Sequence, residues 1–255
     1  MKFKYILIIL FTIFSFYYAD RVMELSEYNN TILTSINDYA STFDNNCIEG
    51  EINDNGIILG LNGIVVDKNK SYSNMKGIGF NKELLEYKSN KCILNKDDNL
   101  DKYILSANKY KKNVSLVIDI NDYSYFKDLE ITAKNENIEL NYLINMKRIR
   151  ADLKNVLYKT NKDDIKEFKK YFNNFYCVKT NDFDILEYCK KQGINSIKIV
   201  NYIEKDLLLN TKKILNKGII IFIKENNQNT KELSSTIKYI KSRGYNIVSI
   251  NELLS

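Results

Sequence analysis

The stretch that decides the fold is Val114-Ser115-Leu116-Val117-Ile118-Asp119, a β-prone run that ends on a carboxylate. It opens a regular alternation of short apolar runs with segments of helical periodicity. We expect strands at 114–118, 138–144, 155–158, 175–178, 196–200, 219–223 and 246–249, and helices at 125–137, 163–172, 182–192, 205–216, 230–243 and 252–254. Strands that alternate with helices in this way indicate parallel strands joined by helical crossovers.

An open doubly wound sheet and a (β/α) barrel both fit this alternation. Glycine is absent from Ile118-Asp119-Ile120-Asn121-Asp122, so a glycine-rich phosphate loop after the first strand is disfavoured. In a barrel the ligand site lies at the carboxyl ends of the strands. The candidate residues of such a mouth are polar, as strand ends exposed to solvent are in any case: Asp119, Asn145, Lys159, Lys179, Asn201, Lys224 and Asn251.

Three expected helices end in polar residues followed by glycine, at Gly193, Gly218 and Gly244. Glycine takes the left-handed position that terminates a helix without steric cost. These residues mark the points where the chain turns from each helix into the next strand.

Composition removes several classes of chemistry. The 255 residues contain no His, no Pro and no Trp. A chain without His cannot use a Ser-His-Asp or Cys-His mechanism, and it cannot build a His-containing zinc site. The formal charge is +6, but it comes from lysines scattered among acids and not from a cluster, so we expect no nucleic-acid partner.

The amino terminus has the pattern of an export signal. Lys2 and Lys4 precede an uncharged stretch, 5–19, whose length suits a secretory signal better than a spanning helix. Tyr17 is bulky where a signal peptidase needs a small residue, which favours an uncleaved anchor. We therefore interpret 1–27 as a membrane-tethering signal anchor or a signal peptide, and we expect the body of the protein to be extracytoplasmic.

The four cysteines suit an oxidising compartment. Two disulfides are expected, and the simplest pairing joins Cys177 with Cys189 and Cys47 with Cys92. Four buried thiols remain the alternative. Ahead of the regular pattern, 28–112 reads as a small α+β region in which Asn62-Gly63 favours a tight hairpin. The expected division is thus 1–27, 28–112 and 113–255.

The segment 113–255 resembles the NodB-homology polysaccharide deacetylases. The resemblance is carried by the 114–119 motif, by Gly218-Ile219-Ile220-Ile221-Phe222-Ile223-Lys224, and by Arg243-Gly244-Tyr245-Asn246-Ile247-Val248-Ser249-Ile250. It implies an irregular (β/α)7-type barrel, preceded here by the α+β region and a hydrophobic amino-terminal helix. It also implies removal of acetyl groups from glycans with a divalent metal such as zinc.

The residues on which that chemistry depends are missing. Asp119 matches the family's catalytic base, but Ile120 stands at the metal-binding position and Lys224 at that of the acid His. The segment near 158–161 offers no His ligands. We therefore expect no metal or other cofactor, with Asp119 and Lys224 as vestigial catalytic residues.

This departure favours a catalytically inactive pseudoenzyme of the cell envelope that binds a cell-wall glycan or an envelope protein. An active glycan deacetylase with a non-standard site and an inert structural spacer are the alternatives.

Overall fold

The computed structural model describes residues 2–179 and 182–255, with the side chains of 8–179 and 182–255. It contains two compact units. The amino-terminal unit comprises Met1–Cys47 and Asn62–Lys91, and the barrel unit comprises Ile48–Leu61 and Cys92–Ser255.

The amino-terminal unit is built on the long helix α1 (Lys2–Phe43). A two-stranded antiparallel sheet, β3 (Gly63–Val66) and β4 (Tyr87–Asn90), accompanies α2 (Lys68–Met75) and the short helix η1 (Lys82–Leu84). The last turns of α1 carry apolar residues at helical spacing on one face. They form a small buried core with α2 and the sheet: Ile32, Ile36, Ala40, Val66, Met75 and Leu85.

The earlier turns of α1 present apolar side chains to solvent. Phe11 and Phe14 are 75% and 70% exposed. In the part of the chain that the structure describes, no helix combines the length and apolarity needed to cross a membrane. The membrane-anchor interpretation of 1–27 gains no support from this result.

The barrel unit holds eleven strands in one sheet. They are β1 (Glu51–Asn53), β2 (Gly56–Ile58), β5 (Tyr103–Ser106), β6 (Asn113–Asp119), β7 (Asn141–Ile144), β8 (Val156–Lys159), β9 (Tyr176–Val178), β10 (Ser196–Ile197), β11 (Asn201–Ile203), β12 (Ile220–Lys224) and β13 (Asn246–Ile247). The helices are α3 (Phe126–Asn135), η2 (Met146–Arg148), η3 (Lys162–Asp164), α4 (Ile165–Phe168), α5 (Phe183–Lys191), α6 (Leu207–Ile214), α7 (Asn227–Ser242) and α8 (Ile250–Leu253). The predicted alternation is confirmed, although the expected strand 196–200 is divided into β10 and β11 and the expected helix 163–172 into η3 and α4.

The sheet closes on itself through one irregular strand. Its parallel order runs β10-β9-β8-β7-β6-β12-β11, and β10 and β11 are consecutive pieces of the chain segment 196–203. Because the two ends of this order belong to one strand, the sheet curls into an irregular barrel and is not an open doubly wound sheet. The barrel predicted from the sequence is confirmed.

The strand β5 fills a gap in this closure. It pairs in parallel with β10, and the Lys198 N–H donates to the Ile104 carbonyl oxygen at 3.0 Å. Beyond β5, the Ala107 N–H donates to the carbonyl oxygen of Gly218, just before β12, at 2.9 Å. The chain ahead of residue 113 therefore supplies part of the barrel wall.

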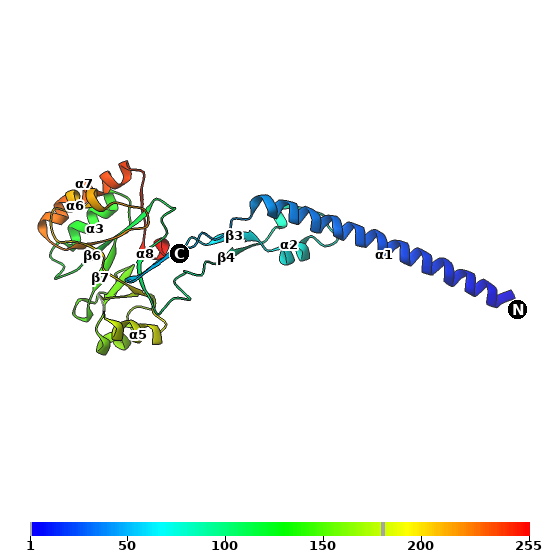
Figure 1. Cartoon of the computed structure of the whole chain (residues 1–255), viewed down its shortest axis with the longest axis horizontal. Helices are drawn as coiled ribbons and strands as arrows, with labels where there is room; N and C mark the ends of the chain where they lie inside the picture. The colour runs from blue at the N-terminus through cyan, green and yellow to red at the C-terminus, as the bar shows by residue number, and fades with distance from the viewer. Residues whose placement is uncertain (1, 180–181) are drawn as a thin grey trace. The chain divides into compact units, whose positions relative to one another are not determined.

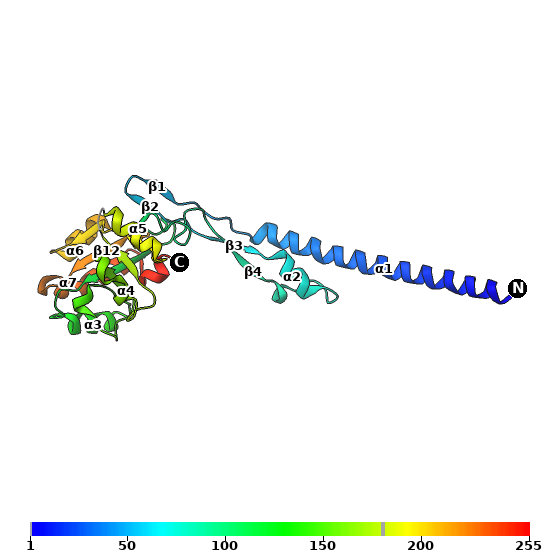
Figure 2. The ribbon, with the colours of Figure 1, turned by 90° about the horizontal axis from the view of Figure 1, so that it is seen from below.

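Two apolar layers lie on the two faces of the sheet. Val114, Leu116 and Ile118 of β6 pack outward, in the cluster shared with helices α3, α4, α5 and α7. Val117 belongs to the inner cluster, which fills the barrel with residues from the other strands. Strand alternation places Ser115 and Asp119 on the same inner face as Val117. Helix α7 lies between α6 and α3 on the outside of the barrel and packs beside both (Figure 1 and Figure 2).

The amino end of the barrel is plugged by α8. Ile250 and Leu253 belong to the inner cluster, and a buried amide fixes the helix in place. The Asn141 side chain donates to the Ser115 hydroxyl and the Leu116 carbonyl, both at 2.9 Å, and accepts from the Ile250 N–H at 2.7 Å. Every polar group of this fully buried side chain that faces the barrel interior is thus satisfied.

The structure corrects several expectations about 28–112. Asn62-Gly63 turns no hairpin, because β2 pairs with β1 and β5 while β3 pairs with β4. Gly63 is required for a different reason, since a Cβ there would lie 2.0 Å from the Asn45 carbonyl oxygen. Stretches 48–61 and 92–112 lie in the barrel unit, although the sequence pattern grouped them with the region before it.

The prediction that glycine ends a helix is confirmed at two of the three positions. Gly193 and Gly244 follow α5 and α7 with φ of +68° and +77°. Gly218 also has a positive φ, +74°, but α6 ends earlier, at Ile214. A Cβ at Gly218 would lie 2.5 Å from the Ala107 carbonyl oxygen, so this glycine permits the close approach of β5.

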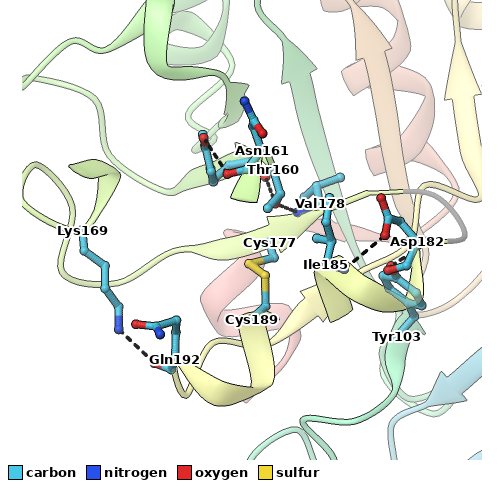
Figure 3. The surroundings of a disulfide bond; sticks show 11 residues. Tyr103, Thr160, Asn161, Lys169, Cys177, Val178, Asp182, Ile185, Cys189 and Gln192 are labelled. Carbon is cyan, nitrogen blue, oxygen red and sulfur yellow. Dashed lines mark hydrogen bonds between the residues drawn. A yellow bond between two sulfur atoms is a disulfide. The ribbon is translucent and has the colours of Figure 1, made fainter. Parts of the chain in front are cut away.

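The predicted disulfide between Cys177 and Cys189 is present, and it ties β9 to α5 (Figure 3). Lys169 donates to the Gln192 carbonyl at the far end of α5, and the Tyr103 hydroxyl donates to the Asp182 carbonyl at its start. Cys47 and Cys92 are disulfide-bonded as well, and no cysteine in the described chain is free. The alternative of four buried thiols is wrong.

Candidate functional site

A buried carboxylate marks the carboxyl end of the barrel. Asp119, the last residue of β6, is 3% exposed. The Lys159 Nζ atom lies 3.0 Å from Asp119 Oδ2 and 3.3 Å from Oδ1. The Tyr202 hydroxyl donates to Oδ2 at 2.8 Å. These three residues are called the Asp119 cluster below.

The barrel geometry explains why these residues meet. They come from β6, β8 and β11, and one further strand separates β6 from each of the other two in the sheet order. In a closed barrel, the inward side chains of alternate strands form one layer across the interior. Asp119, Lys159 and Tyr202 form such a layer at the mouth.

Lys224 lies beside Asp119 but does not neutralise it. The two residues are in register on the adjacent strands β12 and β6. Within the described chain Lys224 forms no ion pair, whereas Lys159 pairs with the carboxylate. The two vestigial catalytic residues expected from the sequence therefore lie side by side, but the cation that pairs with Asp119 is Lys159. Residues level on neighbouring strands project side by side, whereas Lys159 reaches across the mouth.

Tyr202 is the member of the cluster that the sequence analysis missed. The expected strand 196–200 stops too early, because the β pattern continues as β11 through Ile203. Strict alternation from Ile197 would have placed Tyr202 on the outer face, and the irregular passage between β10 and β11 is what turns it inward while Ile203 packs outward. Burial raises the pKa of Tyr202 above its ordinary value, and the hydrogen bond to Asp119 raises it further. The phenol therefore stays protonated and donates to the carboxylate.

A second buried acid shapes the wall of the mouth. Glu225 follows β12 and is 5% exposed. Its carboxylate accepts from the N–H groups of Asn121 at 2.8 Å, of Asp122 and Tyr123 at 3.3 Å, and of Tyr125 at 3.1 Å. Charge-assisted bonds of this kind are stronger than neutral ones. The loop after Asp119 is thereby fixed to the end of β12.

The residues at the mouth do not fit the metal that the family resemblance implies. Ile120, at the expected ligand position, is 3% exposed and packs in the outer, helix-facing cluster. Among the described residues, no three Cys, Asp or Glu ligand atoms converge around Asp119, and the chain has no His. The Lys159 ammonium already contacts both carboxylate oxygens and would repel a divalent cation. No step through a metal follows from this donor set.

Two further predicted mouth residues lie at carboxyl strand ends. Asn145 follows β7 and caps η2, where its Oδ1 accepts from the Lys147 N–H at 3.0 Å. Lys179 follows β9 and is exposed. Within the described chain, neither residue forms a hydrogen bond or ion pair with the Asp119 cluster, so their part in a ligand site stays a prediction.

Two predicted mouth residues lie elsewhere. Asn201 begins β11, and its amide donates to the Ile220 carbonyl at 3.4 Å. Asn251 lies in α8, which plugs the amino end of the barrel. The sequence pattern placed Asn251 at a strand end, but β13 pairs with the first residues of β6, so the chain after it faces the opposite end.

Solved structures similar to this chain were found, whereas comparisons of its sequence found no match. No protein-family model and no curated protein match the sequence. Solved structures do match. A mutant of BA3943, a CE4 family pseudoenzyme with restored enzymatic activity, aligns with a TM-score of 0.63 at 18% identity over 88% of this chain and 98% of the other.

Two further structures extend the likeness. Wild-type BA3943 from Bacillus anthracis gives a TM-score of 0.61 at 18% identity over 88% of this chain and 95% of the other. PdaA from Bacillus subtilis, a family 4 carbohydrate esterase, gives 0.50 at 15% identity over 61% and 86%. Structural similarity at such low sequence identity shows a shared fold and does not show a shared activity. The chain has the fold of the family 4 carbohydrate esterases, and the resemblance to polysaccharide deacetylases predicted from its sequence is confirmed.

Proposed function

We propose that this protein is a catalytically inactive deacetylase-fold protein that binds a cell-envelope glycan at the mouth of its barrel without cleaving it. The observation that carries the proposal is the ion pair between Lys159 and Asp119. In an active member, the residue matching Asp119 acts as a base beside a metal that polarises the acetyl carbonyl. Here the ammonium group of Lys159 forms an ion pair with that carboxylate, and no metal-binding set adjoins it among the described residues.

The Asp119 cluster is suited to holding a charge in place and not to moving a proton. A general base needs a free lone pair near the reacting atom. Both oxygens of Asp119 face Lys159, and one also accepts from Tyr202. No residue of the described mouth takes over the metal's role of supplying a nucleophilic water, so acetyl hydrolysis there would lack an activated nucleophile.

The likeness to BA3943 supports this proposal, because that protein is described as a pseudoenzyme of the same fold. The disulfides support an extracytoplasmic location, since such bonds persist in oxidising compartments. We propose that 5–19 directs the chain out of the cytoplasm as a signal.

The Asp119 cluster contributes one partly exposed aromatic ring to the mouth, and the strand ends contribute several cations. Tyr202 is 37% exposed, whereas Lys159, Lys179 and Lys224 provide ammonium groups at the strand ends. This charge favours an acidic glycan over a neutral one. The second candidate, an inert spacer, is favoured by the single ring of the Asp119 cluster, because one ring is a small platform for a sugar chain.

The test uses the purified full-length chain. Bound metal is measured by mass spectrometry, and acetate release is measured with acetylated chito-oligomers and peptidoglycan. We expect no stoichiometric zinc and no acetate. Zinc at one equivalent together with acetate release would overturn the proposal.

Binding is measured by co-sedimentation with peptidoglycan and with wall glycan stripped of its acidic polymers. We expect saturable binding to the acidic preparation that weakens severalfold in Lys224→Gln. The matched control is Lys238→Gln, an exposed lysine on α7 away from the mouth. Absence of binding to either preparation would leave the spacer as the function.

A further inference from the structure

A cavity of about 490 Å³ opens in the barrel unit where β5 and β10 part from the start of β12. Its apolar lining comes from β2 and β5, from the chain after β10, from the end of α6 and from the residue before β12: Ile58, Leu105, Ile199, Val200, Ile214 and Ile219. A volume of this size is typical of small-molecule sites. The cavity is distinct from the Asp119 cluster, none of whose members lines it.

A buried ammonium stands in this cavity. Lys198, between β10 and β11, is only 9% exposed and lines the pocket. Its Nζ donates to the Asn55 side-chain oxygen at 2.8 Å. Within the described chain Lys198 forms no ion pair. The neutral amide of Asn55 is its one hydrogen-bond partner there, although an ammonium group has three N–H donors.

The surroundings add positive charge and no acid. Lys109 and Lys217 also line the cavity, and no Asp or Glu belongs to its described lining. Lys109 is itself paired with Glu51 at 2.7 Å, so Lys198 and Lys217 are the lining cations without an acidic partner in the described chain. A buried charge is costly unless it is paired, so a site of this kind gains free energy when an anion enters.

We propose that the cavity binds a small organic carboxylate whose apolar body lies on the isoleucine and leucine lining while its carboxylate pairs with Lys198. The lysine supplies the charge, Asn55 orients the ammonium, and the apolar lining selects against a bare inorganic anion. A lysine ammonium beside apolar side chains is complementary to a ligand with one charged end and an apolar body, and not to a fully polar ligand.

The probe is hexanoate, with its neutral counterpart hexanamide and inorganic phosphate as comparisons. Isoleucine methyl groups of the full-length chain are observed by NMR during titration. We expect saturable shifts of the Ile199 and Ile219 signals with hexanoate, and at least tenfold weaker binding of hexanamide and phosphate. Equal binding of hexanamide, equal binding of phosphate, or no saturable shift would overturn the proposal.

The decisive variant is Lys198→Met, which keeps the length of the side chain and removes its charge. Hexanoate binding should weaken tenfold or more, whereas Lys109→Met, on the rim, should change it less than threefold. If Lys198→Met does not fold, Lys198→Gln replaces it, because an amide still donates to Asn55. Unchanged hexanoate affinity in the folded variant contradicts the assignment.

Discussion

Lys159 Nζ lies 3.0 Å from Asp119 Oδ2, although β8 and β6 are not neighbours in the sheet. The contact depends on the closure of the barrel, which brings inward side chains of alternate strands into one layer. The side chain of Asp119 is 4% exposed and that of Lys159 is 50% exposed. The contact therefore presents the ammonium group to solvent at the mouth and keeps the carboxylate buried beneath it.

The first prediction concerns that ion pair. Lys159→Met should lower the free energy of unfolding by about 1–3 kcal/mol, because a buried carboxylate loses its counter-charge and keeps only the Tyr202 hydrogen bond. Urea denaturation at neutral pH measures the change. Lys179→Met, at an exposed position, serves as the control and should shift stability by less than about 0.5 kcal/mol. Equal effects of the two substitutions would show that the pair adds nothing.

The second prediction concerns alkaline pH. Burial raises the pKa of Tyr158 to about 12 and that of Tyr176 to about 12, and the pKa of Tyr202 is raised as well. In the unfolded chain tyrosines ionise near pH 10. Since the unfolded state then releases protons that the folded state keeps, stability is retained below about pH 10 and falls as pH rises toward the folded values. Tyrosinate absorbance at 295 nm should show a late-titrating class in the folded protein.

Circular dichroism recorded along the same titration checks that the protein is still folded. In Tyr202→Phe, fewer tyrosines should belong to the late class. A single transition near pH 10 with the fold intact would contradict the raised pKa values.

The third prediction concerns a reversion toward the family pattern. Ile120→Asp should destabilise the protein by about 3–5 kcal/mol, because the new carboxylate enters an apolar cluster with no cation near it. Thermal unfolding measures the loss. Ile120→Val, which keeps the apolar contact, should cost only about 0.5–1.5 kcal/mol. A stable Ile120→Asp variant that binds zinc would contradict both this prediction and the proposed inactivity.

The fourth prediction concerns the Cys177–Cys189 disulfide, whose cysteines are 12 residues apart in sequence. Replacing both cysteines by Ala should cost about 3 kcal/mol, the value that loop entropy gives for a ring of this size. The free energy of unfolding in urea, without reductant, reports the change. A double variant as stable as the wild type would mean that α5 is held by packing alone.

Much of the architecture could be predicted because β6, α3, α5 and α7 carry strong local patterns. Asp119 was placed at the mouth for the same reason, as the polar residue that ends a buried strand. Sequence periodicity reports which face of an element is buried, but it carries little information about which elements meet across the barrel. The sequence therefore named Lys159 as a residue of the mouth without indicating that it pairs with Asp119 from the opposite side.

The other differences have similar causes. Tyr202 was missed because the irregular passage from β10 to β11 looks like a strand end. Asn251 was placed at the mouth because β13 is short and its pairing with the start of β6 depends on tertiary contacts. The hairpin at Asn62-Gly63 failed since its flanking runs find long-range partners that outweigh the local turn preference.

The position of β5 in the barrel wall has a consequence for which fragments of this protein can be produced. A fragment beginning at residue 113 would retain all the deacetylase-like motifs and still lack the strand that β10 and the carbonyl of Gly218 bind. Its exposed backbone edge would recruit another copy of the same chain, as unpaired strands do. Because β2 covers the other edge of β5 and β1 pairs with β2, a fragment that keeps these edges covered begins upstream of Glu51, well before the point where the recognisable pattern starts.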